Sequence, residues 1–374
     1  MARANGFNAK AVDQFFTNLV TLLEKFSFGP GRIVSLDETG ITNVAVCPKV
    51  LAPTGRKQIG QITAAERGTL VTAVGCIAND GNTIPPVLLF PRLRVPVDRL
   101  GRGAPPGTLT LNSATGWMTA EIFATDVLPH VVRHTKARQD NPILLLLDNH
   151  ASHVSLEAVR FCQANGIHLL TFPPHCSHRL QPLDVAVYGP MKSAYKRALH
   201  DHQMTNPGRR IDLYQMADIF RRAYDCSFTR KNILNGFAAS GVSPLNRDVF
   251  DEADFAPAAV SVPVLVPSAG QPAVAEPEPP AAAVAVPVPA PEPDGPAEAS
   301  LRSPESIRPL PRLQVSERKA GRKKGQSRVM TSTPERAVLE ESHLARTEKN
   351  KRKRVLQSGE GPSKTSKRTA SKLK

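Results

Sequence analysis

The sequence predicts an α/β fold, a mixed sheet flanked by helices, followed by a disordered carboxyl-terminal tail. Three observations lead to this prediction. Runs of β-branched residues that can pair as antiparallel strands come early in the chain, apolar strands then alternate with helical periodicities, and the composition changes abruptly after residue 250. Because alternating strands and helices cover both faces of a sheet, the middle of the chain is expected to be globular.

The chain is expected to open with a helix. Apolar side chains recur at steps of three and four over residues 9–26, and Gly29-Pro30-Gly31 ends the pattern. We assign residues 1–28 to this amino-terminal helix and expect it to pack on the domain that follows.

A β-meander is predicted next. Its strands are expected in four short runs, at residues 33–36, 43–47, 69–77 and 83–90. Asn79-Asp80-Gly81-Asn82 supplies the turn between the last two runs. A loop rich in Pro, Gly and Arg then extends from Pro91 to Gly107.

Strands and helices alternate in the rest of the domain. The predicted elements are a helix at residues 119–134, a strand at 143–147, a helix at 154–165, a strand at 167–172, and helices near 184–203, 212–225 and 230–239. This order is that of a ribonuclease-H-like sheet, although other mixed α/β sheets fit the same periodicity. We therefore take residues 29–250 as one domain.

The last third of the chain has the composition of non-globular sequence. Residues 251–300 contain 12 prolines, eight acidic residues and no Lys or Arg, which predicts an extended, acidic Pro/Ala-rich linker. Residues 301–374 carry 21 basic and seven acidic residues with few aromatics, which predicts a disordered basic tail.

Two clusters in this tail are dense enough in basic residues for nuclear import, for DNA contacts, or for both. They are Arg322-Lys323-Lys324 and Lys351-Arg352-Lys353-Arg354. A solvated run of charge is the plainer alternative, and we expect a nuclear protein. Residues 1–250 are basic in their own right, with 27 basic and 18 acidic residues, which favours a polyanionic partner such as DNA.

Cysteine usage and hydropathy bear on the compartment. The five cysteines are scattered, odd in number and without a Cys-x-x-Cys pair, which predicts a reduced, intracellular protein. The sequence has no apolar run long enough to span a bilayer, so we expect no membrane partner.

Three aspartates are candidates for one site. Asp37 is expected to close the first core strand and Asp148 a buried one, and α/β sheets place ligands at such strand ends. Asp184 follows Pro182 at the start of a predicted helix. A cap or turn role is the alternative for each carboxylate, and spacing alone leaves that alternative open.

The donor set indicates which metal such a site would prefer. Three carboxylates without thiols suit hard ions, Mg²⁺ or Mn²⁺, rather than zinc. Two such ions can activate a water or a 3′-hydroxyl and stabilise the leaving oxygen of a phosphodiester. Four histidines suggest zinc instead, but they have no Cys pair beside them and more often orient carboxylates. They are His150, His153, His175 and His178.

Several segments, in order along the chain, resemble one known family. They are Phe15-Phe16, Arg32-Ile33-Val34-Ser35-Leu36-Asp37-Glu38-Thr39-Gly40, Ile84-Pro85-Pro86, Gly116-Trp117-Met118, Leu147-Asp148-Asn149-His150-Ala151-Ser152-His153, Pro173-Pro174-His175-Cys176-Ser177-His178, Leu180-Gln181-Pro182-Leu183-Asp184-Val185 and Gly241-Val242-Ser243-Pro244-Leu245-Asn246. Together they resemble the DDE superfamily endonuclease domain of pogo/Tigger/jerky-type transposases, relatives of centromere protein B. The resemblance covers about residues 9–250.

This resemblance implies an activity and a set of site residues. It makes Asp37, Asp148 and Asp184 the catalytic, metal-binding carboxylates of a transposase-derived endonuclease. Such an enzyme uses two Mg²⁺ or Mn²⁺ ions for phosphodiester cleavage and strand transfer on DNA. A ribonuclease H that cuts RNA in hybrids would need a further carboxylate that we cannot assign.

The sequence departs from the family in one respect. Members usually carry helix-turn-helix domains before the catalytic domain, and residues 1–8 are too short to hold one. We therefore expect a fragment, a domesticated non-catalytic protein that retains the fold for DNA or chromatin binding, or a chain whose DNA targeting comes from its tail or from a partner protein. A homodimer is left open.

The single tryptophan and a glycine-rich segment do not indicate a further site. The single tryptophan, Trp117, is expected in the core. The glycine-rich segment Gly101–Gly107 lacks the Gly-Lys-Ser/Thr ending of a phosphate loop, so nucleotide binding is not expected there, while a basic loop near DNA is consistent with its arginine.

Overall fold

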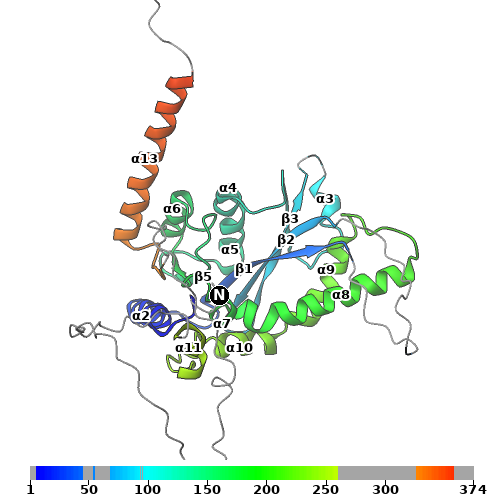
Figure 1. Cartoon of the computed structure of the whole chain (residues 1–374), viewed down its shortest axis with the longest axis horizontal. Coiled ribbons are helices and arrows are strands. Elements are labelled where there is room, and N and C mark those ends of the chain that lie inside the picture. Colours follow the sequence, from blue (N-terminus) through cyan, green and yellow to red (C-terminus); the bar gives the residue numbers. More distant parts are fainter. Residues whose placement is uncertain are drawn as a thin grey trace, which may run out of the picture. The chain divides into compact units, whose positions relative to one another are not determined.

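The computed structural model describes residues 6–44, 54, 68–92, 94, 96–259 and 326–357. Within them, one six-stranded sheet is ordered β4-β3-β2-β1-β5-β6 (Figure 1). Its strands are β1 (Ile33–Thr42), β2 (Leu70–Ala78), β3 (Thr83–Pro91), β4 (Leu109–Ser113), β5 (Ile143–Leu147) and β6 (Ile167–Thr171).

The strand directions make this a ribonuclease-H-like sheet. The meander β1-β2-β3 is antiparallel, as predicted, while β5 pairs parallel with β1 and β6 parallel with β5. β4 adds to β3 in parallel. Only β2 therefore runs against the other strands, and the carboxyl ends of the other five meet at one edge.

Alternation along the strands produces a core on each face. In β5, Leu144 and Leu146 face one core, whereas Ile143, Leu145 and Leu147 face the other, and all five are buried. Such continuous apolar strands are typical of a sheet covered on both sides.

Helices cover both faces of the sheet (Figure 1). The first face, with Leu144, packs against α2 (Ala9–Lys25), α8 (Tyr188–Thr205), α9 (Met216–Ser227) and α10 (Arg230–Ala239). The second packs against a helix with a π-helical segment, made of α4 (Ala120–Ile122), η1 (Phe123–Val127) and α5 (Leu128–Thr135), and against α6 (Leu156–Ala164).

The predicted amino-terminal helix is confirmed as α2. The Asn8 side chain caps it by accepting from the Ala11 backbone N–H at 3.0 Å. Phe15, Phe16 and Leu19 are fully buried, so their spacing of three and four residues places them on the face that meets the core.

Several elements differ from prediction. β1 continues through the polar Asp37 and Glu38 to Thr42, because its backbone stays paired with β2 along that length. Asp37 therefore lies within a strand, and residues 43–44 are not strand, while 45–47 lie outside the described residues. β4 and the short α3 (Val97–Leu100) were not predicted, because both are too short for a clear periodicity.

The start of the predicted linker belongs to the folded core. Residues 252–259 form α11 (Glu252–Ala259). Phe255 stacks on Phe7 with ring centroids 5.2 Å apart, and Asp254 pairs with Arg179 of α7 (Ser177–Leu180). This corrects the linker boundary at residue 251. Residues 260–300 lie outside the described residues.

Part of the predicted basic tail, within residues 326–357, contacts the edge of the sheet. Val329 bridges Leu170 at the free edge of β6, Met330 N donates to Leu169 O at 3.0 Å, and Thr171 N donates to Arg328 O at 3.1 Å. α13 (Thr333–Gln357) follows. Residues 301–325 and 358–374 lie outside the described residues.

The helix α13 is attached to α6 by side chains. Glu340 pairs with Arg160 at 3.1 Å, and Leu339 packs on the second core. The pairing of Val329 with Leu170 joins segments far apart in the chain and leaves no local pattern in the sequence. For this reason the docking of residues 328–330 on β6 was not predicted.

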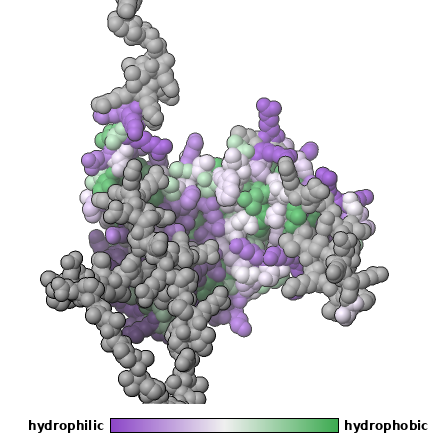
Figure 2. All heavy atoms as spheres, viewed as in Figure 1, coloured by the Kyte–Doolittle hydropathy of each residue, from purple (hydrophilic) through white to green (hydrophobic). Residues whose placement is uncertain are grey.

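The part of the described surface that is coloured in Figure 2 is mostly polar or intermediate in hydropathy. Figure 2 shows hydrophilic or intermediate colouring over most of the face drawn, with smaller hydrophobic patches between. Large apolar side chains with the greatest exposure include Trp117, Met204 and Leu344. No helix among the described residues is both long and apolar enough to cross a membrane.

Candidate active site

The three predicted aspartates come from two strands and one helical turn. Asp37 lies within β1 and Asp148 directly follows β5. Ser35 pairs with Leu146 in parallel register, so continuing the register by two residues places Asp37 beside Asp148. Asp184 lies in η2 (Leu183–Val187), which contacts β1.

Hydrogen bonds fix η2 and the start of α8 on β1. The Tyr188 hydroxyl donates to the Asp37 carbonyl oxygen at 2.5 Å and accepts from Gly75 N at 3.1 Å. Gln181 Nε2 donates to the Leu36 carbonyl oxygen at 3.0 Å, and its Oε1 accepts from Ser35 Oγ. These bonds keep the segment that carries Asp184 next to the strand that carries Asp37.

Gly75 makes this close approach feasible. It lies opposite Asp37 in the β1-β2 register. A Cβ there would be 2.8 Å from Tyr188 Oη and 3.1 Å from the Phe228 ring, closer than side chains pack. A glycine at this point of β2 is therefore needed for Tyr188 to reach β1.

The electrostatics indicate that the three aspartates lie close together. Burial raises the pKa of Asp37 well above its usual range, and the negative charges of Asp184 and Asp148 raise it further. Asp37 and Asp148 are half-buried and Asp184 is exposed. Like charges held together in this way favour a bound cation.

A buried histidine, His153, contacts the carboxylates of Asp148 and Glu38. His153 Nδ1 lies 2.7 Å from Asp148 Oδ1, and its Nε2 lies 2.9 Å from Glu38 Oε1. Burial lowers the pKa of His153, but the hydrogen bonds and charges of Asp148 and Glu38 outweigh it and raise the pKa to about 9. His153 is therefore an imidazolium at neutral pH and donates to both.

The same histidine fixes the geometry around Asp148. The Phe123 ring of η1 lies 4.7 Å from the His153 ring, so an aromatic group covers it on the second face of the sheet. Asp148 Oδ1 also accepts from the His150 backbone N–H at 3.1 Å. Its interactions with His153 and His150 lower the pKa of Asp148 despite the opposing effect of burial.

The site as a whole suits a hard cation in its chemistry. Asp37, Asp148 and Asp184 offer carboxylate oxygens, the ligand type preferred by Mg²⁺ and Mn²⁺. Among the described residues, no three His, Cys, Asp or Glu side chains are grouped tightly enough to form a ready-made metal site. The four described cysteines are free, and the nearest histidine nitrogens are engaged with carboxylates.

The other predicted site residues lie elsewhere. Lys351-Arg352-Lys353-Arg354 lie in α13, whereas Arg322-Lys323-Lys324 fall outside the described residues. Trp117 was expected in the core, but its side chain is 60% exposed. Gly116, at φ 78°, turns the chain so that Met118 enters the core instead.

Sequence reasoning did not identify the partners that position the carboxylates. Glu38, Gln181 and Tyr188 lie within or next to the motifs that suggested the site, but their pairing depends on contacts between distant segments. The expectation that histidines here orient carboxylates is confirmed for His153.

Comparison with known proteins gives a family match over part of the chain. Residues 67–237 match the model of a family described as DDE superfamily endonuclease. The matched segment contains Asp148 and Asp184, and Asp37 precedes it.

A curated protein is also similar to this chain in sequence. Over 238 residues the chain is 32% identical to a protein of Cochliobolus lunatus named MFS-type transporter clz9, covering 62% of this chain and 25% of the relative. The chain thus spans about a quarter of that protein's length.

Solved structures with a similar chain include two Mos1 complexes. The Mos1 strand transfer complex has a TM-score of 0.41 and 15% identity, covering 63% of this chain and 59% of the Mos1 chain. The Mos1 mariner paired end complex with Mn has a TM-score of 0.42 and 14% identity, covering 64% and 63%.

Proposed function

We propose that the chain is a transposase-derived endonuclease that cleaves DNA phosphodiesters and transfers strands, since its residues 67–237 match the model of the family described as DDE superfamily endonuclease. The observation that carries the proposal is that the register of β1 and β5 places Asp37 beside Asp148, while Asp184 lies near enough for its charge to raise the pKa of Asp37. Such a carboxylate cluster suits cleavage of a phosphodiester better than it suits a structural role.

The proposed cofactor is a pair of Mg²⁺ or Mn²⁺ ions held by these three aspartates. When bound, such ions activate a nucleophilic oxygen and stabilise the charge on the leaving one. The aspartates contribute ligand oxygens and the negative charge that draws cations to the site.

The remaining residues position these ligands. The His153 imidazolium donates to Asp148 and Glu38, so it fixes the orientation of the Asp148 carboxylate. Tyr188 and Gln181 tie the segment carrying Asp184 to β1. The Asp148 carboxylate is therefore held by a buried partner, and the segment that carries Asp184 is held against β1.

DNA is the proposed substrate and the nucleus the proposed compartment. The basic excess of residues 1–250 and of the tail supports a polyanionic partner. We also propose that the chain forms a homodimer and that a partner protein supplies sequence-specific DNA binding.

A nicking assay tests this function. The full chain is incubated with supercoiled plasmid DNA and Mn²⁺, alongside Asp148→Asn and the control Asp140→Asn. Asp140 is 70% exposed, pairs with Arg138, and precedes β5 rather than following it. We expect nicking by the parent and the control, and a loss of at least about 100-fold in Asp148→Asn, because a ligand should matter more than its hydrogen-bonding partners do.

Two results would change the proposal. If Asp148→Asn nicks as fast as the parent, the active site is elsewhere. If the parent binds the DNA without nicking it, the alternative of a domesticated, non-catalytic DNA- or chromatin-binding protein replaces the enzyme.

A further inference from the structure

The connection between β3 and β4 presents a row of exposed arginines. They are Arg92, Arg94, Arg99 and Arg102. Asp98 is the sole acidic residue between Pro91 and Gly107. None of the four arginines forms an ion pair with any residue that the structure describes, so their charges are available to an anionic ligand.

Trp117 projects from a hydrogen-bonded turn close to Pro91, the residue before Arg92. Gly116 O accepts from Thr72 Oγ1 at 2.8 Å, and Gly116 N donates to Ser113 Oγ at 2.9 Å. On its other side, Met118 is buried in the core. The backbone is thus anchored on both sides while the indole itself remains 60% exposed.

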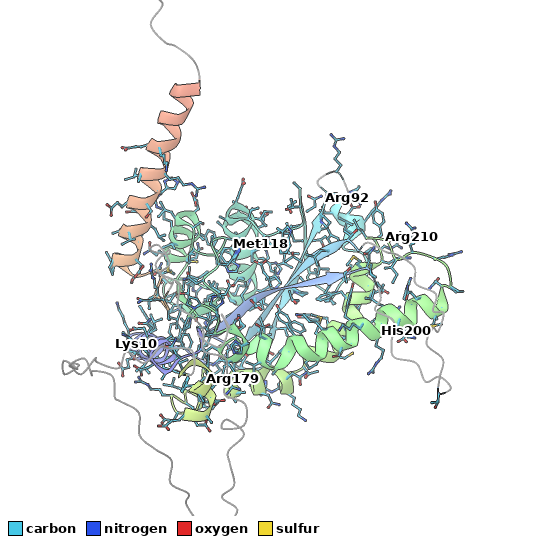
Figure 3. All side chains as sticks on the ribbon, viewed as in Figure 1. Lys10, Arg92, Met118, Arg179, His200 and Arg210 are labelled. Atoms are coloured by element: carbon cyan, nitrogen blue, oxygen red, sulfur yellow. The ribbon has the colours of Figure 1, made fainter. Side chains whose placement is uncertain are left out.

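The turn and the arginine segment are neighbours. A Cβ on Gly116 would lie 3.0 Å from the backbone nitrogen of Pro91, the residue directly before Arg92. Pro91 and Ser113 also pair at the ends of β3 and β4. Figure 3 labels Arg92 and Met118, which mark the two segments.

This surface lies at the same end of the sheet as the aspartates. β3, β4 and β5 run in the same direction, so Arg92, Trp117 and Asp148 all follow the carboxyl ends of their strands. A strand of DNA that reaches the aspartates can therefore continue along this edge toward β4.

We propose that Trp117, Arg92 and Arg94 form a binding surface for single-stranded DNA, in which an unpaired base stacks on the indole and the two arginines contact phosphates. The proposal rests on the proposed function, since it names the form of DNA held next to the site. An indole face that is open to solvent accepts a base only when that base is not paired inside a duplex. Arginine recognises phosphate with a planar, multidentate group.

Intrinsic fluorescence reports on this surface directly, because Trp117 is the only tryptophan in the chain. The full chain, without divalent ions, is titrated with a single-stranded oligonucleotide and with the blunt duplex of the same sequence. Binding is followed in parallel by the anisotropy of a fluorescein label on the DNA. We expect the single strand to quench Trp117 emission strongly and the duplex to quench it much less.

Substitutions separate stacking from charge. Trp117→Ala should weaken single-strand binding at least about fivefold, whereas Trp117→Phe should keep most of it because it retains a ring. The control Leu245→Ala removes another exposed apolar side chain, on a loop packed against α2 near the opposite edge of the sheet, and should bind as the parent does.

Replacing Arg92 and Arg94 together by Gln should weaken binding of single strand and duplex alike. For the single strand, the slope of log affinity against log salt concentration should become shallower by roughly 0.7 for each phosphate that is no longer neutralised.

The outcomes distinguish this inference from the function on which it rests. If anisotropy reports DNA binding while Trp117 emission and the affinity of Trp117→Ala are unchanged, the surface is not used and the proposed function stands. If the folded chain binds neither form of DNA, the proposed function fails and the inference fails with it. A comparable unfolding temperature for Trp117→Ala and the parent shows that any weakening of binding does not come from unfolding.

Discussion

His153 is the residue on which the local geometry of the candidate site most depends. Its ring is buried between Glu38 of β1 and Asp148, which directly follows the parallel strand β5, and it donates to both. Two half-buried carboxylates this close together would repel each other without this cation, because neither charge would be compensated. The histidine therefore stabilises the fold as well as orienting Asp148.

The raised pKa of His153 predicts a pH dependence of stability. Because its folded pKa of about 9 exceeds the ordinary value of 6.5, its stabilisation is complete below pH 6.5 and is lost as the pH rises through about 9. The total is at most on the order of 3 kcal/mol. In His153→Gln, denaturant titrations should show a lower stability at pH 6.5 and a flatter dependence between pH 6.5 and 9. Equal slopes in parent and variant would contradict this assignment.

In the metal-free protein at neutral pH, the charge of Asp37 lowers the stability of the fold, whereas the charge of His153 raises it. The pKa of Asp37 is raised, so its contribution to stability is present below pH 3.8 and is lost as the pH rises through the folded value. Asp37→Asn removes the charge that is unfavourable in the folded state. We therefore expect its unfolding temperature at neutral pH, in a chelator, to exceed that of the parent, with the difference shrinking in acid. A lower unfolding temperature at neutral pH would show that Asp37 is not in repulsive contact with the other aspartates.

The sequence indicated the elements that carry the candidate carboxylates better than it indicated the contacts that hold these carboxylates. Asp148 follows five consecutive aliphatic residues, which marks a buried strand and its end. Asp37 was expected at a strand end because polar residues follow it, whereas pairing with β2 continues the strand to Thr42. The bonds from Gln181 and Tyr188 join segments about 150 residues apart, and a single sequence carries no signal for them.

At the scale of elements, local pattern predicted the strands and helices that are long or strongly apolar. The helix α2 and the strand β5 are examples, because their buried faces repeat with a clear period. β4 was missed because it is too short for a clear periodicity, and the segment around Val329 because it is defined by its pairing with a strand far away in sequence. Trp117 was misplaced for a related reason: the turn at Gly116 decides which neighbour is buried.

The docking of the tail on β6 predicts a measurable contribution to stability. Met330 is 3% exposed and packs on the second core, so Met330→Ala should destabilise the full chain by about 2–4 kcal/mol, as other buried Met truncations do. Val338→Ala on α13 is the control, since that side chain is 52% exposed. Chemical denaturation measures both. Equal stabilities of Met330→Ala and the parent would show that the segment is not docked in solution.

At the scale of the whole molecule, charge and fold point to the same chemistry. The folded residues and the tail are both basic, yet the edge of the sheet collects Asp37, Asp148 and Asp184. A basic surface attracts DNA, and an acidic cluster within it attracts the cations that phosphodiester chemistry uses. This arrangement follows from five strands that run in one direction, since that topology brings residues far apart in sequence to one edge.

Calorimetric titration of the full chain with Mn²⁺ tests most directly whether the three aspartates form one metal site. The account predicts that the parent and the control Asp140→Asn bind Mn²⁺ equally well, while Asp37→Asn, Asp148→Asn and Asp184→Asn each bind at least about 100-fold more weakly, because each removes a ligand from the same site. Mn²⁺ binding that is absent from the folded parent, or unchanged in any of the three variants, would contradict it.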